Sequence, residues 1–194
     1  MRTKSGKPAV FLDRDGVLTE ESGYIDSVDN LKLFPYTAEC IRQIHNKGYY
    51  AIVITNQSGV ARGLFTEEKL QEMNGYLMEQ TNVDAIFYCP HHPDGIVEKY
   101  RKECCCRKPG TGMFVMACGE YAINMQRSYM VGDRAGDILA GRQAGVRTIL
   151  VESGYGTKGL EADVTPDETM RDLRDVAKYL PDAAEDLQSR TEMV

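Results

Sequence analysis

Two aspartates near the start of the chain could share one chemical reaction. Asp13 and Asp15 are separated by one residue, directly follow the apolar run Val10-Phe11-Leu12, and are followed by Gly16. An apolar run of this kind is typical of a strand buried in a parallel sheet. Because open α/β sheets bind their ligands at the carboxyl ends of the strands, the spacing predicts that Asp13 and Asp15 form a catalytic pair at a sheet edge.

Polar residues after other apolar runs could complete the site of these acids. Thr55 and Asn56 follow a second apolar run, Asp133 follows a later one, and Lys108 precedes a proline and a predicted helix. The carboxyl ends of parallel strands meet at one edge, so these groups can converge although they are far apart in the chain. Carboxylates, a hydroxyl group and a fixed cation suit phosphoryl transfer with a divalent metal. Each segment alone fits a turn or a helix N-cap, and only their joint occurrence in this order indicates an active site.

Strand and helix patterns alternate along the chain and predict the elements that hold these residues. Short apolar runs predict strands at residues 10–12, 50–54, 85–88, 129–131 and 148–151, with a short edge strand at 162–164. Spacing of apolar residues and capping residues predict helices at 36–46, 66–80, 112–123, around 138–140 and at 168–179. Strands that alternate with helices indicate an α/β fold, a doubly wound parallel sheet.

The length of the chain predicts one domain. At 194 residues it is long enough for one well-buried core, which we expect over about 8–180, followed by a polar tail at 181–194. We see no segment long enough for a separate lid domain. The fold is therefore expected to be capless, with the connections 16–34 and 89–108 as the walls over the site.

Composition and charge exclude several classes of partner. The formal net charge of -6 argues against a general nucleic-acid or anionic-membrane binder. No apolar run approaches the roughly 20 residues of a membrane-spanning helix, and the basic N-terminus lacks the apolar core of a signal peptide. A small-molecule enzyme in the cytoplasm, without a nucleic-acid or membrane partner and acting as a monomer, is the expectation.

Cysteines and histidines cluster in the connection 89–108. Cys89-Pro90-His91-His92 and Cys104-Cys105-Cys106 are two close groups of soft ligands separated by a loop, as a structural four-coordinate Zn²⁺ site requires. In extended chain, alternate side chains point the same way. The expected zinc ligands are therefore Cys89, His91, Cys104 and Cys106, with His92 and Cys105 as the alternatives.

The zinc loop ends directly at Arg107 and Lys108. Its expected role is therefore to fix these two residues beside the acids and not to perform chemistry. Cys40 and Cys118 lie on predicted helices and are expected to behave as small apolar residues.

The chain resembles the haloacid dehalogenase superfamily phosphatases in four ordered motifs: Asp13-Arg14-Asp15-Gly16, Thr55-Asn56, Lys108 and Gly132-Asp133-Arg134-Ala135-Gly136-Asp137. The resemblance implies a Rossmann-like fold of that type, with Asp13 as the nucleophile that forms an aspartyl-phosphate and Asp15 as the general acid and base. It also implies Mg²⁺ held by Asp13, Asp133 and the backbone carbonyl of Asp15, with Thr55 and Lys108 holding the phosphoryl group. Asp137 is expected at most to orient its neighbours.

Over about residues 8–155 the chain resembles more narrowly the D-glycero-D-manno-heptose 1,7-bisphosphate 7-phosphatases. The shared segments are Gly23-Tyr24, residues 55–63, residues 88–93 and Cys106-Arg107-Lys108-Pro109, and the departures are Val17, Cys105 and Arg134. This likeness implies hydrolysis of the C7 phosphate of that sugar phosphate, in nucleotide-activated heptose biosynthesis. It places at the substrate Glu21, Ser22, Gly23, Tyr24, Asn56, Gln57, Ser58, Arg107 and Arg134.

Two other functions compete with this interpretation. Histidinol-phosphate phosphatases share the superfamily motifs and a zinc loop, although their metal loop is typically shorter. A non-catalytic receiver domain phosphorylated on aspartate also clusters acids, a threonine and a lysine, but it needs neither the zinc loop nor Arg107. A dinucleotide-binding oxidoreductase is disfavoured because no Gly-x-Gly-x-x-Gly follows the first strand.

Overall fold

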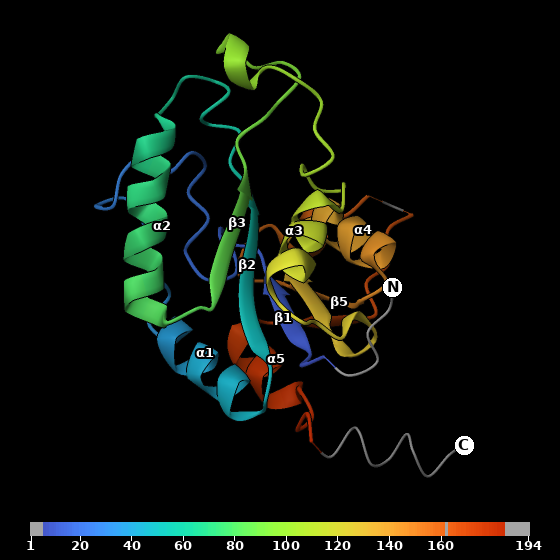
Figure 1. Ribbon diagram of the computed structural model, residues 1–194. Helices are drawn as coiled ribbons and strands as arrows, with labels where there is room; N and C mark the ends of the chain where they lie inside the picture. The colour runs from blue at the N-terminus through green and yellow to red at the C-terminus, as the bar shows by residue number, and fades with distance from the viewer. Residues whose placement is uncertain (1–5, 162, 185–194) are drawn as a thin grey trace.

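Strand β1 (Ala9–Leu12) is completely buried because helices cover both of its faces. The computed structural model describes residues 6–161 and 163–184, and in them β1 lies inside a parallel sheet with the order β3-β2-β1-β4-β5-β6 (Figure 1). The other strands are β2 (Tyr50–Asn56), β3 (Ala85–Cys89), β4 (Tyr129–Gly132), β5 (Arg147–Val151) and β6 (Glu168–Met170). The strand order reverses between β1 and β4, and ligands bind at such a switch point. The predicted doubly wound sheet is confirmed.

Helices form a layer on each face of the sheet (Figure 1). One layer contains α1 (Thr37–Asn46), α2 (Glu67–Thr81) and α5 (Leu173–Tyr179), and the other contains α3 (Gly112–Glu120) and α4 (Ala135–Ala144). Side chains of β1 alternate between the layers: Val10 and Leu12 join the core under α1 and α2, whereas Phe11 packs edge-on against Phe114 of α3, with ring centres 4.6 Å apart. None of the helices in the described residues is long and apolar enough to cross a membrane.

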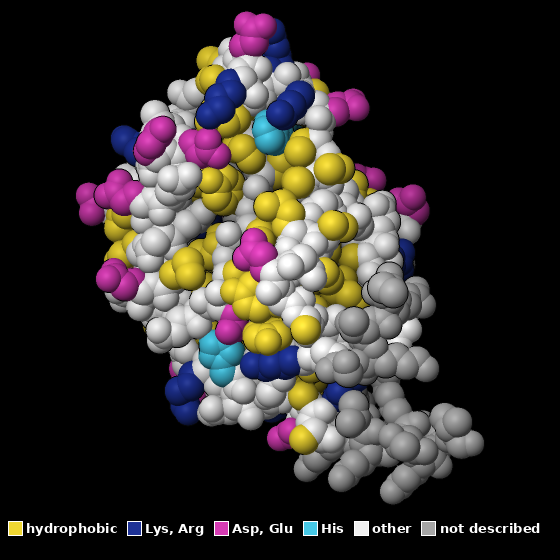
Figure 2. Space-filling model, viewed as in Figure 1, with side chains coloured by type: hydrophobic (Ala, Val, Ile, Leu, Met, Phe, Trp, Pro, Cys, Tyr) yellow, Lys and Arg dark blue, Asp and Glu magenta, His cyan; other side chains and the backbone are white. Residues whose placement is uncertain are grey.

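The long connection between β3 and α3 projects beyond the carboxyl edge of the sheet (Figure 1). Within it, only the short helical turn η1 (Glu98–Tyr100) is regular. Figure 2, viewed from the same side, shows hydrophobic side chains over the middle of this face and charged side chains towards the outer rim and over this connection. We call residues 89–108 the metal loop.

The structure corrects the prediction for the end of the chain. Asp163 and Val164 form no strand, and Ala162 lies outside the described residues. The edge strand is instead β6, which pairs in parallel with β5, so the predicted helix 168–179 begins only at Leu173. Asp172 caps this helix by accepting a 2.9 Å hydrogen bond from the Arg174 N–H.

Two further boundaries differ from expectation. Helix α3 ends at Glu120, before the predicted residue 123, because Tyr121 has extended backbone angles. Of the predicted polar tail, residues 185–194 lie outside the described part of the chain, whereas the Ala183 N–H donates to the Lys47 carbonyl oxygen at 2.8 Å.

Candidate active site

The carboxyl edge of the sheet brings together the residues that the sequence predicted to converge. Asp13 and Asp15 follow β1, Thr55 lies near the end of β2, and Lys108 lies shortly before α3. All four line one cavity of about 380 Å³. All but one of the predicted substrate residues also line this cavity: Glu21, Gly23, Tyr24, Asn56, Gln57, Ser58, Arg107 and Arg134. The exception is Ser22.

Lys108 is buried between two carboxylates. Its Nζ lies 3.0 Å from Asp13 Oδ1 and 2.6 Å from Asp137 Oδ1, and it donates a 2.7 Å hydrogen bond to the Ile54 carbonyl oxygen. Burial lowers the pKa of a lysine, but the attraction of Asp13 and Asp137 outweighs burial here and raises the pKa of Lys108. The lysine is therefore a fixed cation beside Asp13, and Asp137 is its second counter-ion.

Asn56 holds the main chain at Lys108. Its Nδ2 donates to the Lys108 carbonyl oxygen, and its Oδ1 accepts from the Lys108 N–H, both at 3.0 Å. Asn56 lines the cavity as expected for a substrate residue, but its amide is engaged with this backbone. The position of the lysine is thus tied to the end of β2.

Arg14, between the two acids, is completely buried and pairs with Asp15. Its Nε and Nη2 donate to the two Asp15 carboxylate oxygens at 2.9 and 3.0 Å, and Gln57 Nε2 donates to Asp15 Oδ2 at 2.9 Å and to Thr55 Oγ1 at 3.0 Å. Burial disfavours the charged Asp15, but the charge and hydrogen bonds of Arg14, with those from Gln57 and Thr19, outweigh burial and lower the pKa of Asp15. Asp15 is therefore oriented and held ionised, a role for Arg14 that the sequence pattern did not indicate.

Asp133 completes a cluster of acids next to Asp13. Carboxylate oxygens of Asp13, Asp133 and Asp137 lie within 4.8 Å of one another. Asp133 is completely buried; its Oδ2 accepts the Tyr155 N–H at 2.8 Å, and its Oδ1 has no hydrogen-bond partner among the described residues. Burial, then the charge of Asp13, raises the pKa of Asp133 to about 7, and burial raises the pKa of Asp13 to about 6.

These features fit a divalent cation. Mg²⁺ prefers carboxylate and carbonyl oxygens, and a cation would offset the unfavourable burial of Asp13 and Asp133 and engage the free Oδ1. Gly16 and Gly154 enclose the Asp133 carboxylate so closely that a Cβ on either would overlap it. Asp137 is less suited as a ligand, since both of its oxygens are engaged, Oδ1 by Lys108 Nζ and Oδ2 by the Arg134 N–H at 3.1 Å.

At the mouth of the cavity, Arg134 links two segments. Its Nη2 lies 3.1 Å from Glu21 Oε2, and its guanidinium carbon lies 3.8 Å from the ring centre of Tyr155. Burial lowers the pKa of Arg134, but the pair with Glu21 outweighs burial and raises it. Tyr155 also lines the cavity, and sequence reasoning missed it. The signal was available: Tyr155 lies just beyond β5, whose carboxyl end meets the same sheet edge.

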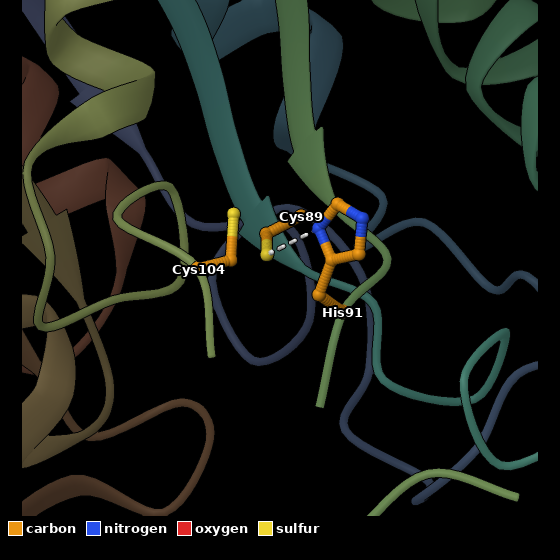
Figure 3. Close-up of side chains that lie close together, drawn as sticks. All are labelled: Cys89, His91 and Cys104. Atoms are coloured by element: carbon orange, nitrogen blue, oxygen red, sulfur yellow. Dashed lines mark hydrogen bonds between the residues drawn. The ribbon is translucent and has the colours of Figure 1, made fainter. Parts of the chain in front are cut away.

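In the metal loop, three of the predicted ligands lie close together. Cys89 Sγ, a nitrogen of His91 and Cys104 Sγ lie within 4.8 Å of one another, and Cys89 Sγ contacts His91 Nδ1 at 3.8 Å (Figure 3). Ligand atoms of a tetrahedral zinc ion lie about 3.5–4 Å apart, so this soft donor set fits zinc. His92 is used elsewhere: its Nδ1 accepts the Asp94 N–H at 3.1 Å, and its Nε2 lies 3.2 Å from Arg62 Nη2.

Cys104, Cys105 and Cys106 do not alternate as an extended strand would. The Arg107 N–H donates to the Cys104 carbonyl oxygen at 3.0 Å, which closes a turn, and the three thiol sulfurs lie within 4.8 Å of one another. The prediction that extended chain separates Cys106 from Cys105 is therefore wrong in its physical reason. Cys106 adjoins Cys104 but is not within this distance of both Cys89 and His91. The geometry thus groups Cys89, His91 and Cys104 and leaves the fourth ligand open between Cys105 and Cys106.

The metal loop contacts both the active site and α2. Arg107 Nη1 donates to the His91 carbonyl oxygen at 3.5 Å, and burial lowers the pKa of Arg107. On the other side, Glu67 in the first turn of α2 accepts a 2.6 Å hydrogen bond from the hydroxyl group of Tyr100 in the loop, and a 3.2 Å one from Tyr88 of β3, just before the loop. The Val97 N–H donates to the Ala61 carbonyl oxygen at 3.0 Å, and His92 contacts Arg62, so the metal loop is held by the segment after β2 and by α2 as well as at its own two ends.

Comparison with known proteins agrees with the fold and the acid cluster. The HAD-hydrolase-like family model matches residues 105–176. The parallel sheet, the acids at its carboxyl edge and this match together define a hydrolase of the haloacid dehalogenase type.

Relatives that match nearly the whole chain identify the family within this class of hydrolases. The D-glycero-beta-D-manno-heptose-1,7-bisphosphate 7-phosphatase of Haemophilus ducreyi is 40% identical over 182 residues, which cover 90% of this chain and 99% of the relative. The enzyme of the same name from Escherichia coli (strain K12) is 38% identical, over 89% of this chain and 93% of the relative. The chain belongs to the D-glycero-beta-D-manno-heptose-1,7-bisphosphate 7-phosphatase family, and the resemblance seen in its motifs is confirmed.

Solved structures show the same likeness. The crystal structure of D,D-heptose 1,7-bisphosphate phosphatase from B. bronchiseptica, complexed with magnesium and phosphate, has a TM-score of 0.78 and 34% identity, covering 89% of this chain and 97% of the other. The D,D-heptose 1,7-bisphosphate phosphatase from Burkholderia thailandensis has a TM-score of 0.65 and 30% identity, with the same coverage.

Proposed function

We propose that this chain is a Mg²⁺-dependent phosphatase that removes the C7 phosphate of D-glycero-D-manno-heptose 1,7-bisphosphate, in the biosynthesis of nucleotide-activated heptose. The observation that carries the proposal is the arrangement of Asp13, with Lys108 Nζ at 3.0 Å and Asp133 within 4.8 Å, on the wall of a cavity. The names of the relatives support the substrate, and the magnesium and phosphate bound to the B. bronchiseptica enzyme support the metal and the reaction.

In this proposal Asp13 is the nucleophile. A carboxylate oxygen attacks phosphorus, the bond to the sugar oxygen breaks, and an aspartyl-phosphate forms that water then hydrolyses. Lys108 Nζ and the Thr55 hydroxyl group hold the oxygens of the transferring group, because both line the cavity with Asp13 and Lys108 Nζ lies 3.0 Å from the Asp13 carboxylate. A bound Mg²⁺, held by Asp13, Asp133 and the Asp15 carbonyl oxygen, would supply positive charge that offsets the negative charge of the phosphoryl group.

Asp15 acts in both halves of the proposed reaction. Held ionised by Arg14, it is ready to accept a proton from the attacking water in the second half. In the first half it must donate a proton to the sugar oxygen, and the negative charge of an entering phosphate favours its protonation. Gln57 keeps Asp15 aligned with Thr55 throughout, because it donates to both side chains.

A comparison of substrates tests this proposal. We expect kcat/KM for the heptose 1,7-bisphosphate, measured with both anomers, to exceed that for histidinol phosphate and fructose 1,6-bisphosphate by at least about tenfold, since differential contacts of about 1.4 kcal/mol suffice for that factor. Released phosphate is measured, with Asp13→Asn as the blank. A higher kcat/KM for histidinol phosphate would overturn the choice of sugar, and stable aspartyl-phosphate without turnover would indicate a receiver domain.

We further propose that the metal loop binds one structural Zn²⁺ through Cys89, His91, Cys104 and Cys106. The close approach of Cys89, His91 and Cys104 supports three of these ligands, and Cys106 is chosen as the fourth because it adjoins Cys104 and is less exposed than Cys105. The His91 carbonyl contact to Arg107 supports the role of fixing Arg107 and Lys108. Zinc in such a closed site contributes to folding free energy directly.

Zinc loss should therefore lower stability and activity together. We expect Cys89→Ser to lose zinc, to lower the melting temperature by at least about 5 °C and to reduce kcat/KM, because the metal loop then no longer holds Arg107. Zinc content is measured by mass spectrometry and melting by calorimetry. Cys118→Ser, an exposed thiol of α3 outside the cluster, is the matched control. Full activity with unchanged melting after verified zinc loss would contradict the role.

A further inference from the structure

The mouth of the cavity contains an arginine whose orientation is set by two neighbours. Arg134 precedes α4 as its N-cap, and its side chain is about half exposed, yet it is held by Glu21 through Nη2 and by the ring of Tyr155 against its guanidinium group. An exposed arginine normally samples many rotamers, and fixing them costs free energy on binding. Here the two contacts order the guanidinium group before any ligand arrives.

The backbone around Tyr155 is itself fixed. Its N–H donates to Asp133 Oδ2 at 2.8 Å, and Gly154 lies against the same carboxylate. Gly156 has φ of +58°, where a side chain would be strained, and a Cβ there would overlap Glu152. The Tyr155 ring thus stands on a segment anchored to the proposed metal ligand.

Arg134 keeps free hydrogen-bond donors. Among the described residues its side chain pairs only with Glu21, through Nη2, which leaves Nε and Nη1 for a ligand. Arg134 and Tyr155 line the same cavity as Asp13, but both are roughly half exposed and so lie at its mouth, whereas Asp13 and its partner Lys108 are buried. A second anionic group of the substrate, distinct from the phosphate that Asp13 attacks, would meet the already oriented guanidinium group of Arg134 there.

We propose that Tyr155 is a positioning residue that, by stacking on Arg134, presets this arginine for the second phosphate of a sugar bisphosphate and so favours bisphosphates over monophosphates. This inference rests on the proposed function. Tyr155 acts through Arg134 and need not touch the reacting atoms. The loss of a cation–π contact with an arginine corresponds to a factor of about 2–30 in affinity.

The test compares two substrates that differ only in the second phosphate. The ratio of kcat/KM for heptose 1,7-bisphosphate to that for heptose 7-phosphate is measured for the wild type, Tyr155→Leu and Tyr155→Phe. We expect Leu to lower this ratio about five- to tenfold, chiefly through a higher KM for the bisphosphate. Phe keeps the aromatic face and should restore at least half of the wild-type ratio.

A double-mutant cycle shows whether the effect passes through Arg134. In an Arg134→Gln background, Tyr155→Leu should change the ratio by less than about twofold, because the partner of the ring is gone. The Mg²⁺ concentration for half-maximal activity reports on Asp133 and should shift less than about twofold in Tyr155→Leu, since the contact of Tyr155 to Asp133 uses backbone.

The outcomes separate this inference from the proposed function. A wild type without preference for the bisphosphate contradicts the proposed substrate itself. If the wild type prefers the bisphosphate and Tyr155→Leu leaves that preference intact, only the role of Tyr155 is overturned. The same holds if Tyr155→Leu lowers the ratio as much in the Arg134→Gln background as in the wild type. A large shift in Mg²⁺ dependence also overturns it, because the ring would then act through the metal site.

Discussion

Asp13→Asn should abolish turnover while the protein stays folded. We expect kcat to fall by about 10⁴-fold or more, the scale seen when a catalytic nucleophile is removed, because an amide cannot form the aspartyl-phosphate. Acid quenching of a reaction with radiolabelled substrate should trap a phosphoenzyme in the wild type and none in the variant. Asp29→Asn, an exposed aspartate of the connection 16–34, is the matched control.

The loss of activity can be separated from unfolding because the Asp13 charge is unfavourable in the metal-free fold. Its pKa of about 6 lies above the ordinary 3.8, so ionised Asp13 lowers the folding stability of the metal-free protein above pH 6. The neutral Asn should therefore melt at least as high as the wild type at pH 8 in Mg²⁺-free buffer without chelator, which leaves the proposed zinc in place. A collapse of stability in Asp13→Asn would contradict this assignment of charges.

Lys108→Met should produce the largest loss of stability. It removes the cation between Asp13 and Asp137 and leaves buried carboxylates without compensation, which costs about 3–5 kcal/mol in free energy of unfolding. The cost should be greatest at pH 8, where Asp13 must ionise, and smaller at pH 5, below the Asp13 pKa of about 6. Urea unfolding of the Mg²⁺-free protein at both pH values measures it.

Two further variants show that the cost arises from charge. Lys108→Met combined with Asp137→Asn should recover part of the lost stability, because one uncompensated carboxylate is then removed. Lys32→Met, at an exposed lysine, should change the free energy of unfolding by less than about 0.5 kcal/mol. An equal loss at pH 5 and pH 8 would indicate lost packing and not lost charge.

Much of this fold could be predicted because most of its strands are buried apolar runs, and several of these runs are followed directly by polar side chains that could be catalytic. Asp13, Thr55 and Asp133 could be placed at one sheet edge from strand pattern and parallel topology alone. The edge strand β6 could not, since Glu168-Thr169-Met170 is mostly exposed and carries no apolar signal. Its pairing depends on β5 being beside it.

The parts of the site that escaped prediction depend on contacts distant in sequence or on buried charge. Arg14 lies between the two acids, but a charged residue is normally exposed, and its complete burial depends on Asp15 and Gln57 accepting its hydrogen bonds. The place of Tyr155 beyond β5 could have been predicted, but its contact with the Arg134 guanidinium group could not, because α4 and β5 separate the two residues in the chain. The side chains of residues 104–106 do not alternate in direction as expected, because the chain forms a turn there.

Both ends of the metal loop lie beside one residue, Asn56 at the end of β2. Cys89, where the loop begins, is the register partner of Asn56, and Lys108, where it ends, is hydrogen-bonded to the Asn56 amide. Because lengthening a surface loop with fixed ends costs little free energy, insertions or deletions in its outer part can change the wall of the cavity without moving the lysine. Because Asn56 holds both ends of the loop, the outer part of the loop can change in evolution while Lys108 keeps its place beside Asp13. Substrate range can therefore diverge between relatives that share the same reaction.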